Sequence, residues 1–441
     1  MNCECEICKN NKPFELPDEI IEATIKGELV LFCGAGISTE GKNVMPFTFY
    51  SSIQEELGIE DDSISFSNLM QRYCEQPNGR KKLLKKIRER FQYIHSFAEL
   101  ERQATKFHRE LAEIHPIHTI ITTNWDTYFE QYCGAVPITI PEDFAFWVER
   151  SRFVLKMHGS IDNLSSVIAT SEDYEKCYKQ LQNGVIGATL KNILATKTVL
   201  FIGFSFGDED FTQIIDYLRN EMGELYPHIY MVTLDDTLKG RLNYKNCTSI
   251  ITSGTYFLHQ LKNVLIQKEV IRNCNSVPLI ETALEEAERV HGIVSEVDLS
   301  KFPCAIYTLA YQDGVIHAWE RFLQNYNTGE YNCPDYIVRV ARSYEKMTDD
   351  CYKAKNYWDM SYYEGYTNGI LLIGACDMNP EAILYFPFLF LPNARKDLKT
   401  IKIYGEELKR VSGIRSKYTT YASKIVDGIE ENGIVVHHPP F

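Results

Sequence analysis

The chain has 441 residues, of which 44% are hydrophobic and 24% are charged, and its formal net charge at pH 7 is -14. These fractions are typical of a globular protein with enough chain for two or three domains. The acidic balance argues against a chain that wraps nucleic acid by itself, and we find neither an apolar run of membrane-spanning length nor a signal-peptide pattern.

Thirteen cysteines are scattered along the chain, which favours a reducing cytoplasmic compartment over a disulfide scaffold. Residues 1–14 are expected to form an N-terminal tail. Its thiols, Cys3, Cys5 and Cys8, would suit a zinc site, but no partner pair with Cys-x-x-Cys spacing follows them. We therefore favour a plain tail and expect no metal. Residues 17–27 predict a short helix leading into the first strand.

An uninterrupted apolar run at residues 29–33 is followed directly by Gly34-Ala35-Gly36-Ile37-Ser38. Five apolar residues in succession indicate a buried parallel strand. The two glycines allow a sharp turn whose amides approach a ligand closely, and the helix-like start after the turn suits a pyrophosphate. A glycine turn of this kind also occurs for packing reasons alone.

Three later β-rich runs also end in polar or glycine residues. Residues 118–123 lead into Asn124-Trp125-Asp126, residues 152–157 lead into His158-Gly159-Ser160, and residues 198–202 lead into the segment Gly203 to Asp208. Because an open parallel sheet places its ligand contacts at the carboxyl ends of its strands, we expect these segments to share one site.

Helical periodicity predominates between the first two strands, so a helical insertion is expected at about residues 50–115. Seven basic residues between Arg80 and Arg90 fall on one predicted helix. A solvated face is the favoured interpretation, and contact with nucleic acid or an acidic partner is the alternative.

Beyond residue 205, the pattern predicts a packing helix that starts near Asp208, strands at 229–234 and 249–252, and a closing helix at 261–270. These alternating elements indicate a doubly wound α/β domain over residues 15–275. Residues 276–441 are rich in Tyr and Phe and mostly helical in period, with a β-like or buried run at 385–392. We expect this smaller domain to serve oligomerisation or partner docking.

The order Gly-Ala-Gly-Ile-Ser, Thr-x-Asn-x-Asp, His-Gly and Gly-x-Ser resembles the NAD-binding domain of the sirtuins over about residues 15–265. This resemblance implies a Rossmann-like sheet that binds NAD as a substrate. The implied NAD contacts are Gly34, Ala35, Gly36, Ile37, Ser38, Pro46, Thr123, Gly203 and Ser205. It also implies that Asn124 and His158 direct the nucleophile and that Asp126 faces the nicotinamide carboxamide. An amide and an imidazole suit the direction of a nucleophile. The amide of Asn124 offers both a donor and an acceptor, and the imidazole of His158 takes a proton near neutral pH.

Departures from the sirtuin pattern indicate hydrolysis rather than protein deacylation. Sirtuins carry a zinc module with four cysteines between the His-Gly and Gly-x-Ser motifs, whereas this interval contains only Cys177. Without the peptide slot that this module completes, water is the expected nucleophile, and nicotinamide and ADP-ribose are the expected products. This form resembles the sirtuin-like effectors of bacterial anti-phage defence, and most of all the subunit that pairs with a HerA-type hexameric ATPase.

We therefore expect an NAD+ glycohydrolase that forms a homo-oligomer, pairs with such an ATPase and does not contact membranes. Contact with nucleic acid is compatible with this expectation only through that complex. The alternative is a regulatory subunit that binds NAD, ADP-ribose or nucleic acid without chemistry. Residual deacylase activity is a third interpretation.

Overall fold

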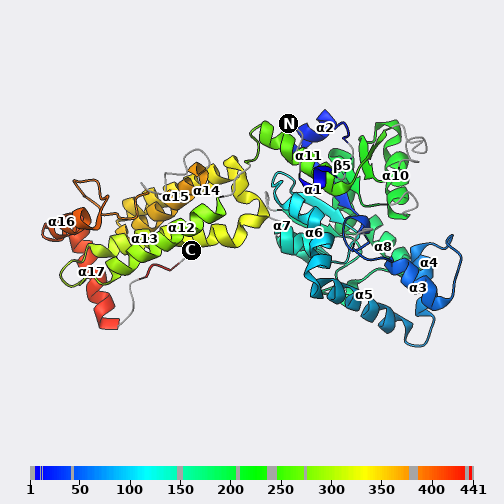
Figure 1. Ribbon diagram of the computed structural model, residues 1–441, viewed down its shortest axis with the longest axis horizontal. Helices are drawn as coiled ribbons and strands as arrows, with labels where there is room; N and C mark the ends of the chain where they lie inside the picture. Colours follow the sequence, from blue (N-terminus) through cyan, green and yellow to red (C-terminus); the bar gives the residue numbers. More distant parts are fainter. Residues whose placement is uncertain are drawn as a thin grey trace. The chain divides into compact units, whose positions relative to one another are not determined.

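The structure is a computed structural model that describes residues 5–9, 11, 13–40, 44–146, 152–204, 209–235, 246–272, 276–376, 386–432 and 437–439. The chain divides into two compact units, residues 1–271 and residues 272–441 (Figure 1). Among the described helices, none has both the length and the apolar content needed to cross a bilayer.

Parallel strands form the centre of the first unit. Within the described residues the sheet has seven strands in the order β3-β4-β2-β1-β5-β6-β7, and all neighbouring strands are parallel. Their bounds are β1 Leu29–Cys33, β2 Thr119–Thr122, β3 Val136–Ile138, β4 Phe153–Lys156, β5 Thr198–Ile202, β6 Ile229–Thr233 and β7 Cys247–Ile251. The strand order reverses between β1 and β5, and open parallel sheets bind ligands at such a reversal.

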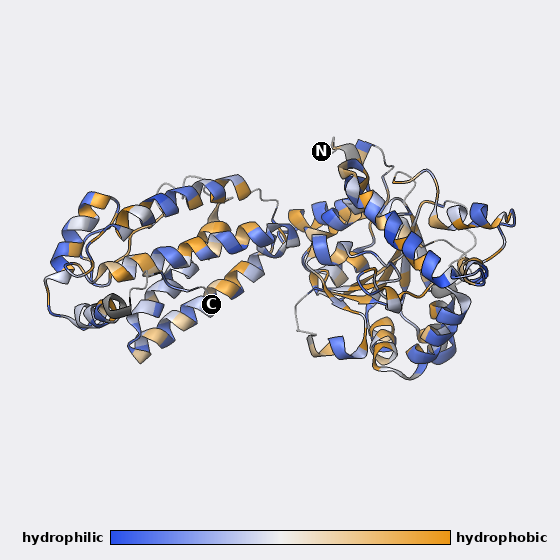
Figure 2. Cartoon of the chain, turned by 90° about the horizontal axis from the view of Figure 1, so that it is seen from below, coloured by the Kyte–Doolittle hydropathy of each residue, from blue (hydrophilic) through white to orange (hydrophobic). Residues whose placement is uncertain are grey.

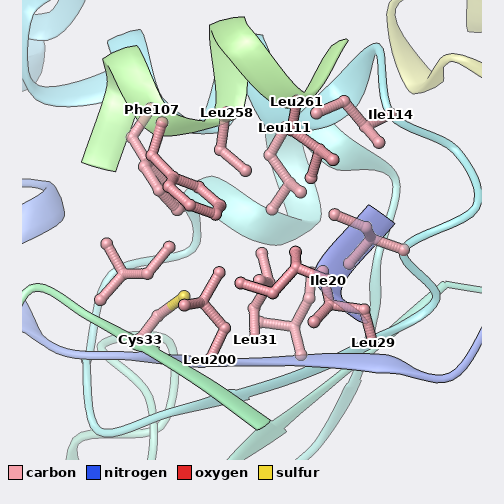
Figure 3. Packing of buried hydrophobic residues seen from close by; sticks show 14 of the residues in the cluster. Ile20, Leu29, Leu31, Cys33, Phe107, Leu111, Ile114, Leu200, Leu258 and Leu261 are labelled. Carbon is pink, nitrogen blue, oxygen red and sulfur yellow. The ribbon is translucent and has the colours of Figure 1, made fainter. Parts of the chain in front are cut away.

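Both faces of the sheet are covered, which explains why its strands are continuously apolar. On one face, Leu29, Leu31 and Cys33 of β1 pack under helices α2 (Asp18–Ile25), α6 (Ala98–Ala112), α7 (Tyr128–Cys133) and α11 (Gly254–Gln267). Figure 3 shows this layer, with Phe107 and Leu258 above the strands. The opposite face is covered by α9 (Val185–Thr196) and α10 (Glu209–Met222). Figure 2 shows hydrophobic and hydrophilic residues interleaved along the helices, as amphipathic helices require.

The insertion between β1 and β2 contains α3 (Phe49–Leu57), α4 (Phe66–Cys74), α5 (Gly79–Ser96) and α6. Helices α3–α5 form a hydrophobic cluster that also includes Val167 and Ala169. Helix α5 is the predicted basic helix, and three of its cations bind carboxylates outside this helix. Arg80 pairs with Asp173 at 2.6 Å, Lys86 pairs with Glu56 at 2.7 Å and Arg90 pairs with Glu40 at 2.9 Å. The Arg80–Asp173 pair joins the insertion to α8 (Ser171–Asn183), whereas the Lys86–Glu56 pair lies within the insertion.

The second unit is helical. Its helices are α12 (Val277–Ser295), α13 (Ala305–Asn325), α14 (Pro334–Ala354), α15 (Tyr357–Ala375), α16 (Ile401–Ser412) and α17 (Lys417–Asn432). The predicted fold class, a doubly wound parallel sheet with a helical insertion and a smaller helical C-terminal part, is confirmed.

Several local predictions differ from the structure. Strand β3 was not predicted, because it has only three residues and its central Pro137 lacks an amide donor, which restricts it to a sheet edge. Helix α11 begins at Gly254 rather than near residue 261, because Ser253 caps it by accepting a hydrogen bond from the Tyr256 amide. In the run at 385–392, the described residues from 386 onward form no strand. Their carbonyls at Phe388 and Phe390 accept hydrogen bonds from side chains of α13 instead.

Candidate active site

A cleft of about 1270 Å³ opens along the carboxyl edge of the sheet. Residues after four strands line it: 35–37 after β1, 123–126 after β2, His158 after β4, and 203–204 after β5. The insertion contributes a second wall through parts of α3 and α5, and residues 233–235 and 252–255 close the far end. This volume exceeds that of most sites for drug-sized ligands and suits a ligand as long as a dinucleotide.

The turns after β1 and β5 meet without intervening side chains. Gly203 has φ +81°, and a Cβ atom added to it would lie 2.7 Å from the carbonyl oxygen of Gly34. The Gly36 amide donates to the Gly203 carbonyl at 3.0 Å, and the Gly34 amide donates to the Ile202 carbonyl at 2.9 Å. Only glycine allows the two main chains to approach this closely. Ala35 and Gly36 of the turn after β1 are exposed to the cleft.

A buried hydrogen-bond chain links the ends of β1 and β2. The Ser38 hydroxyl donates to Asp126 Oδ2 at 3.0 Å, and Asn124 Nδ2 donates to the Ser38 hydroxyl oxygen at 3.3 Å. All three side chains are at most 5% exposed. The strand ends thus hold a carboxylate, a hydroxyl and an amide in one fixed arrangement.

This chain determines the orientation of the Asn124 amide. Ser38 has one hydroxyl hydrogen, and the Asp126 carboxylate accepts it, so the Asn124 atom that faces Ser38 must be the donor nitrogen. The carbonyl oxygen Oδ1 of Asn124 is buried and has no hydrogen-bond partner among the described residues. A ligand with a hydroxyl donor would satisfy this acceptor.

A buried cation supports the loop that carries Asp126. Lys156, at the end of β4, donates to the main-chain oxygen of Asp126 and pairs with Glu130 Oε1 at 2.9 Å. Burial raises the pKa of the Glu130 carboxyl, and the nearby Lys156 ammonium opposes that rise. The Tyr128 amide donates to Asp126 Oδ1 at 3.3 Å, so both carboxylate oxygens are held.

His158 follows β4 and is 3% exposed, yet it lines the cleft. Its ring packs against the ring of Tyr174 with centroids 4.8 Å apart. Tyr174 belongs to α8 (Ser171–Asn183), which begins with a capping box formed by Thr170 and Asp173. The next residue, Gly159, has φ +77°, and the main chain turns sharply there. Helix α8 therefore fixes the histidine ring at the cleft.

The structure brings most of the sequence-predicted residues to this cleft. Ala35, Gly36, Ile37, Thr123, Asn124, Asp126, His158 and Gly203 line it. Gly34 is buried against Gly203, and Ser38 lies behind the surface, bonded to Asp126. Pro46 is exposed and is not among the lining residues, and Ser205 lies outside the described residues.

Sequence reasoning did not identify the ion pair that fastens the loop after the glycine turn. Arg90 Nη2 binds Glu40 Oε1 at 2.9 Å and the Phe47 carbonyl at 3.1 Å, while the Phe49 amide donates to Glu40 Oε2 at 2.8 Å. Arg90 and Glu40 both line the cleft. Trp125, whose ring lies 6.4 Å from that of Phe49, joins the same wall. The sequence shows the basic run, but it does not show that Arg90 pairs with Glu40, which lies 50 residues upstream.

Residues 118–250 match a family model described as a SIR2-like domain. The chain is 31% identical over 212 residues to the "NAD(+) hydrolase ThsA" of Cytobacillus dafuensis, which covers 47% of this chain and 41% of the relative. It is 32% identical over 206 residues to the protein of the same name from Enterococcus faecium, covering 45% and 41%. "Defense-associated sirtuin 2" of Bacillus subtilis is 24% identical over 237 residues, covering 51% and 23%.

The chain thus spans about two-fifths of the length of the first two relatives. A solved structure titled "Structural Basis for the Mechanism and Regulation of Sir2 Enzymes" aligns with a TM-score of 0.31 at 16% identity, over 57% of this chain and 99% of the other. The fold assignment rests on the strand order described above, not on that alignment.

Proposed function

We propose that the cleft binds NAD and hydrolyses the bond between nicotinamide and ribose, giving nicotinamide and ADP-ribose. Two relatives that are 31% and 32% identical to this chain are named NAD(+) hydrolases. The observation that carries the proposal is the Ser38–Asp126–Asn124 chain, buried at the point of strand-order reversal beside a glycine turn. A dinucleotide phosphate would lie against Ala35 and Gly36, the exposed residues of that turn.

The chemistry requires little acid catalysis. Nicotinamide leaves as a neutral ring, and the ribose passes through an oxocarbenium-like state. The site must therefore clamp the dinucleotide, orient the nicotinamide and direct the nucleophile. Asp126 would face the carboxamide of the nicotinamide, and its carboxylate is already held by Ser38 and the Tyr128 amide. A fixed carboxylate orients a ligand without first paying the entropy of ordering its own side chain.

Asn124 and His158 would handle the nucleophile. The buried Asn124 Oδ1 accepts a hydrogen bond from a ribose hydroxyl or from the attacking water. The His158 imidazole takes a proton from water or from a ribose hydroxyl as the new C–O bond forms. Water is the acceptor in this proposal, since the interval between His158 and Gly203 holds α8 and α9 and a single cysteine, the buried Cys177.

We further propose that the activity serves anti-phage defence. One relative is named a defence-associated sirtuin. Assembly into a homo-oligomer and pairing with a HerA-type hexameric ATPase stay predictions from the resemblance, so the test below includes that partner.

The test is nicotinamide release from NAD by the full chain, alone and with a co-expressed HerA-type ATPase. Asn124→Ala and His158→Ala are expected to lower the rate by at least 100-fold, in the range that positioned acid–base groups supply. His228→Ala is the matched control, because His228 lies at the opposite, amino end of β6 and bonds Thr248. Circular dichroism and thermal melting check that each variant folds.

Full activity in both site variants would refute the proposed roles. Tight NAD binding without release in any preparation would favour the non-catalytic subunit. Release that requires an acyl-lysine peptide would instead indicate deacylation.

A further inference from the structure

We infer that Cys5, Cys8 and His259 form a zinc site that fastens the N-terminal segment to helix α11. The two sulfur atoms and a ring nitrogen of the histidine lie within 4.8 Å of one another. Cys5 Sγ lies 3.6 Å from His259 Nε2, although these residues are 254 positions apart. Two thiols and an imidazole are soft ligands of the kind that zinc prefers.

The separation of the Cys5 sulfur from the His259 nitrogen fits a tetrahedral ion. Zinc–sulfur and zinc–nitrogen bonds of about 2.3 and 2.05 Å, at a tetrahedral angle, place sulfur and nitrogen roughly 3.6 Å apart. The Cys5–His259 separation has this value. Three ligands leave one of the four coordination positions of zinc for water or another group. Cys3, the remaining thiol of the N-terminal segment, lies outside the described residues.

The surroundings of the sulfur atoms also favour metal binding. Cys5 and Cys8 form a Cys-x-x-Cys turn at α1 (Glu6–Lys9), in which the Cys8 amide donates to Cys5 Sγ at 3.4 Å. Gln260 Nε2 donates to Cys8 Sγ at 3.7 Å. Amide donors thus already point at both sulfur atoms, as outer-shell hydrogen bonds do around metal ligands.

The histidine is oriented as zinc-binding histidines commonly are. Its Nδ1 atom lies 3.2 Å from Glu110 Oε2 on α6, so Nδ1 carries the proton and the Nε2 lone pair faces the thiols. Lys262 pairs with the same Glu110 oxygen at 2.8 Å and with Glu113 at 3.2 Å. The carboxylate is thus fixed, and it holds the imidazole ring in position.

The site would stabilise one end of the cleft. Asn11, three residues after Cys8, accepts a hydrogen bond from the Ser253 hydroxyl at 2.9 Å. Ser253 caps α11 and, with Gly254 and Thr255, lines the cleft. A clip between the N-terminal segment and α11 therefore supports the loop that forms this wall. The expectation of a plain, metal-free tail arose because the third ligand is remote in sequence.

The test is metal content of the full chain, purified without chelators or metal columns, measured by inductively coupled plasma mass spectrometry. We expect about one zinc per chain. Cys5→Ser/Cys8→Ser should reduce this at least tenfold, while the matched control Cys74→Ser/Cys351→Ser, which removes two partly exposed thiols elsewhere, should retain it.

A second readout does not depend on the stability of the double variant. After cobalt replaces zinc, sulfur-to-cobalt charge-transfer absorption is expected in the full chain and in the control, and His259→Gln should weaken it. A chelator should lower the Tm of the parent chain more than that of His259→Gln. The inference would be overturned if the parent protein contained no zinc and bound no cobalt. It would also be overturned if the Cys5→Ser/Cys8→Ser variant contained as much zinc as the parent protein. A Cys5–Cys8 disulfide in protein purified under reducing conditions would overturn it as well.

Discussion

Replacing Lys156 by methionine removes the buried cation that holds the Asp126 loop. The Lys156 side chain is fully buried, and that of its partner Glu130 is 17% exposed. Removing one member of a buried ion pair costs about 3–5 kcal/mol, because the other charge is left without a partner. Glu130 can take up a proton, since burial already raises its pKa, so we expect the lower end, about 3 kcal/mol.

The assay is amide hydrogen exchange of β2 and β4 in the full chain, which reports the opening free energy of this unit alone. A cost of about 3 kcal/mol corresponds to roughly 100-fold faster exchange. Lys86→Met is the matched control: its pair with Glu56 is 35% and 41% exposed and is worth at most about 1 kcal/mol. Adding Glu130→Gln to Lys156→Met should restore much of the protection, because no charge is then left unpaired.

The effect of pH has a defined sign. In Lys156→Met, the pKa of Glu130 in the folded chain lies above its value in the unfolded chain. The penalty is therefore fully present above the folded pKa, and it shrinks as pH falls towards the unfolded value of about 4.5. The role assigned to the buried pair would be refuted if amide exchange were no faster in Lys156→Met than in Lys86→Met. It would also be refuted if the double variant recovered none of the lost protection.

Three further outcomes are expected. Gly203→Ala should lower the free energy of unfolding by about 1–3 kcal/mol and abolish nicotinamide release, because the added Cβ at φ +81° meets the neighbouring turn. The control Gly223→Ala, at φ +61° with open space around it, should leave release intact. Equal release in both variants would contradict this prediction. Burial lowers the pKa of His108 to about 4, so below pH 6.5 the unfolded chain binds a proton that the folded chain does not. The free energy of unfolding should therefore fall by up to about 3 kcal/mol between pH 6.5 and 4. Urea titrations should show a smaller fall in His108→Leu. Arg152→Lys should destabilise the first unit by about 3 kcal/mol, as measured by amide exchange. The buried guanidinium donates to five main-chain carbonyls, and a lysine ammonium cannot reproduce this forked set of donors. Unchanged protection in the variant would argue against this role.

The sequence alone determined the layers of the fold. Continuous apolar runs such as residues 29–33 are stable only between two covering layers, so they indicated a parallel sheet with helices on both faces. The carboxyl ends of parallel strands share one edge, so the positions of Asn124, Asp126 and His158 after their strands were enough to predict that they lie in one cleft. These are consequences of local pattern and strand direction, which a sequence carries directly.

Only the tertiary structure decided which side chains meet. Ser38 was predicted to contact NAD, and the structure adds that its hydroxyl binds Asp126, 88 positions away. Helix α5 was predicted as basic, but its Arg90 gains its role from a direct ion pair with Glu40, 50 positions earlier in the chain.

The candidate zinc ligands Cys5 and Cys8 meet His259 only because α11 packs beside the N-terminal segment. Such contacts depend on how helices dock on the sheet. Docking is set by shape and by satisfaction of buried polar groups over the whole core, and neither is encoded in the spacing of residues along the chain.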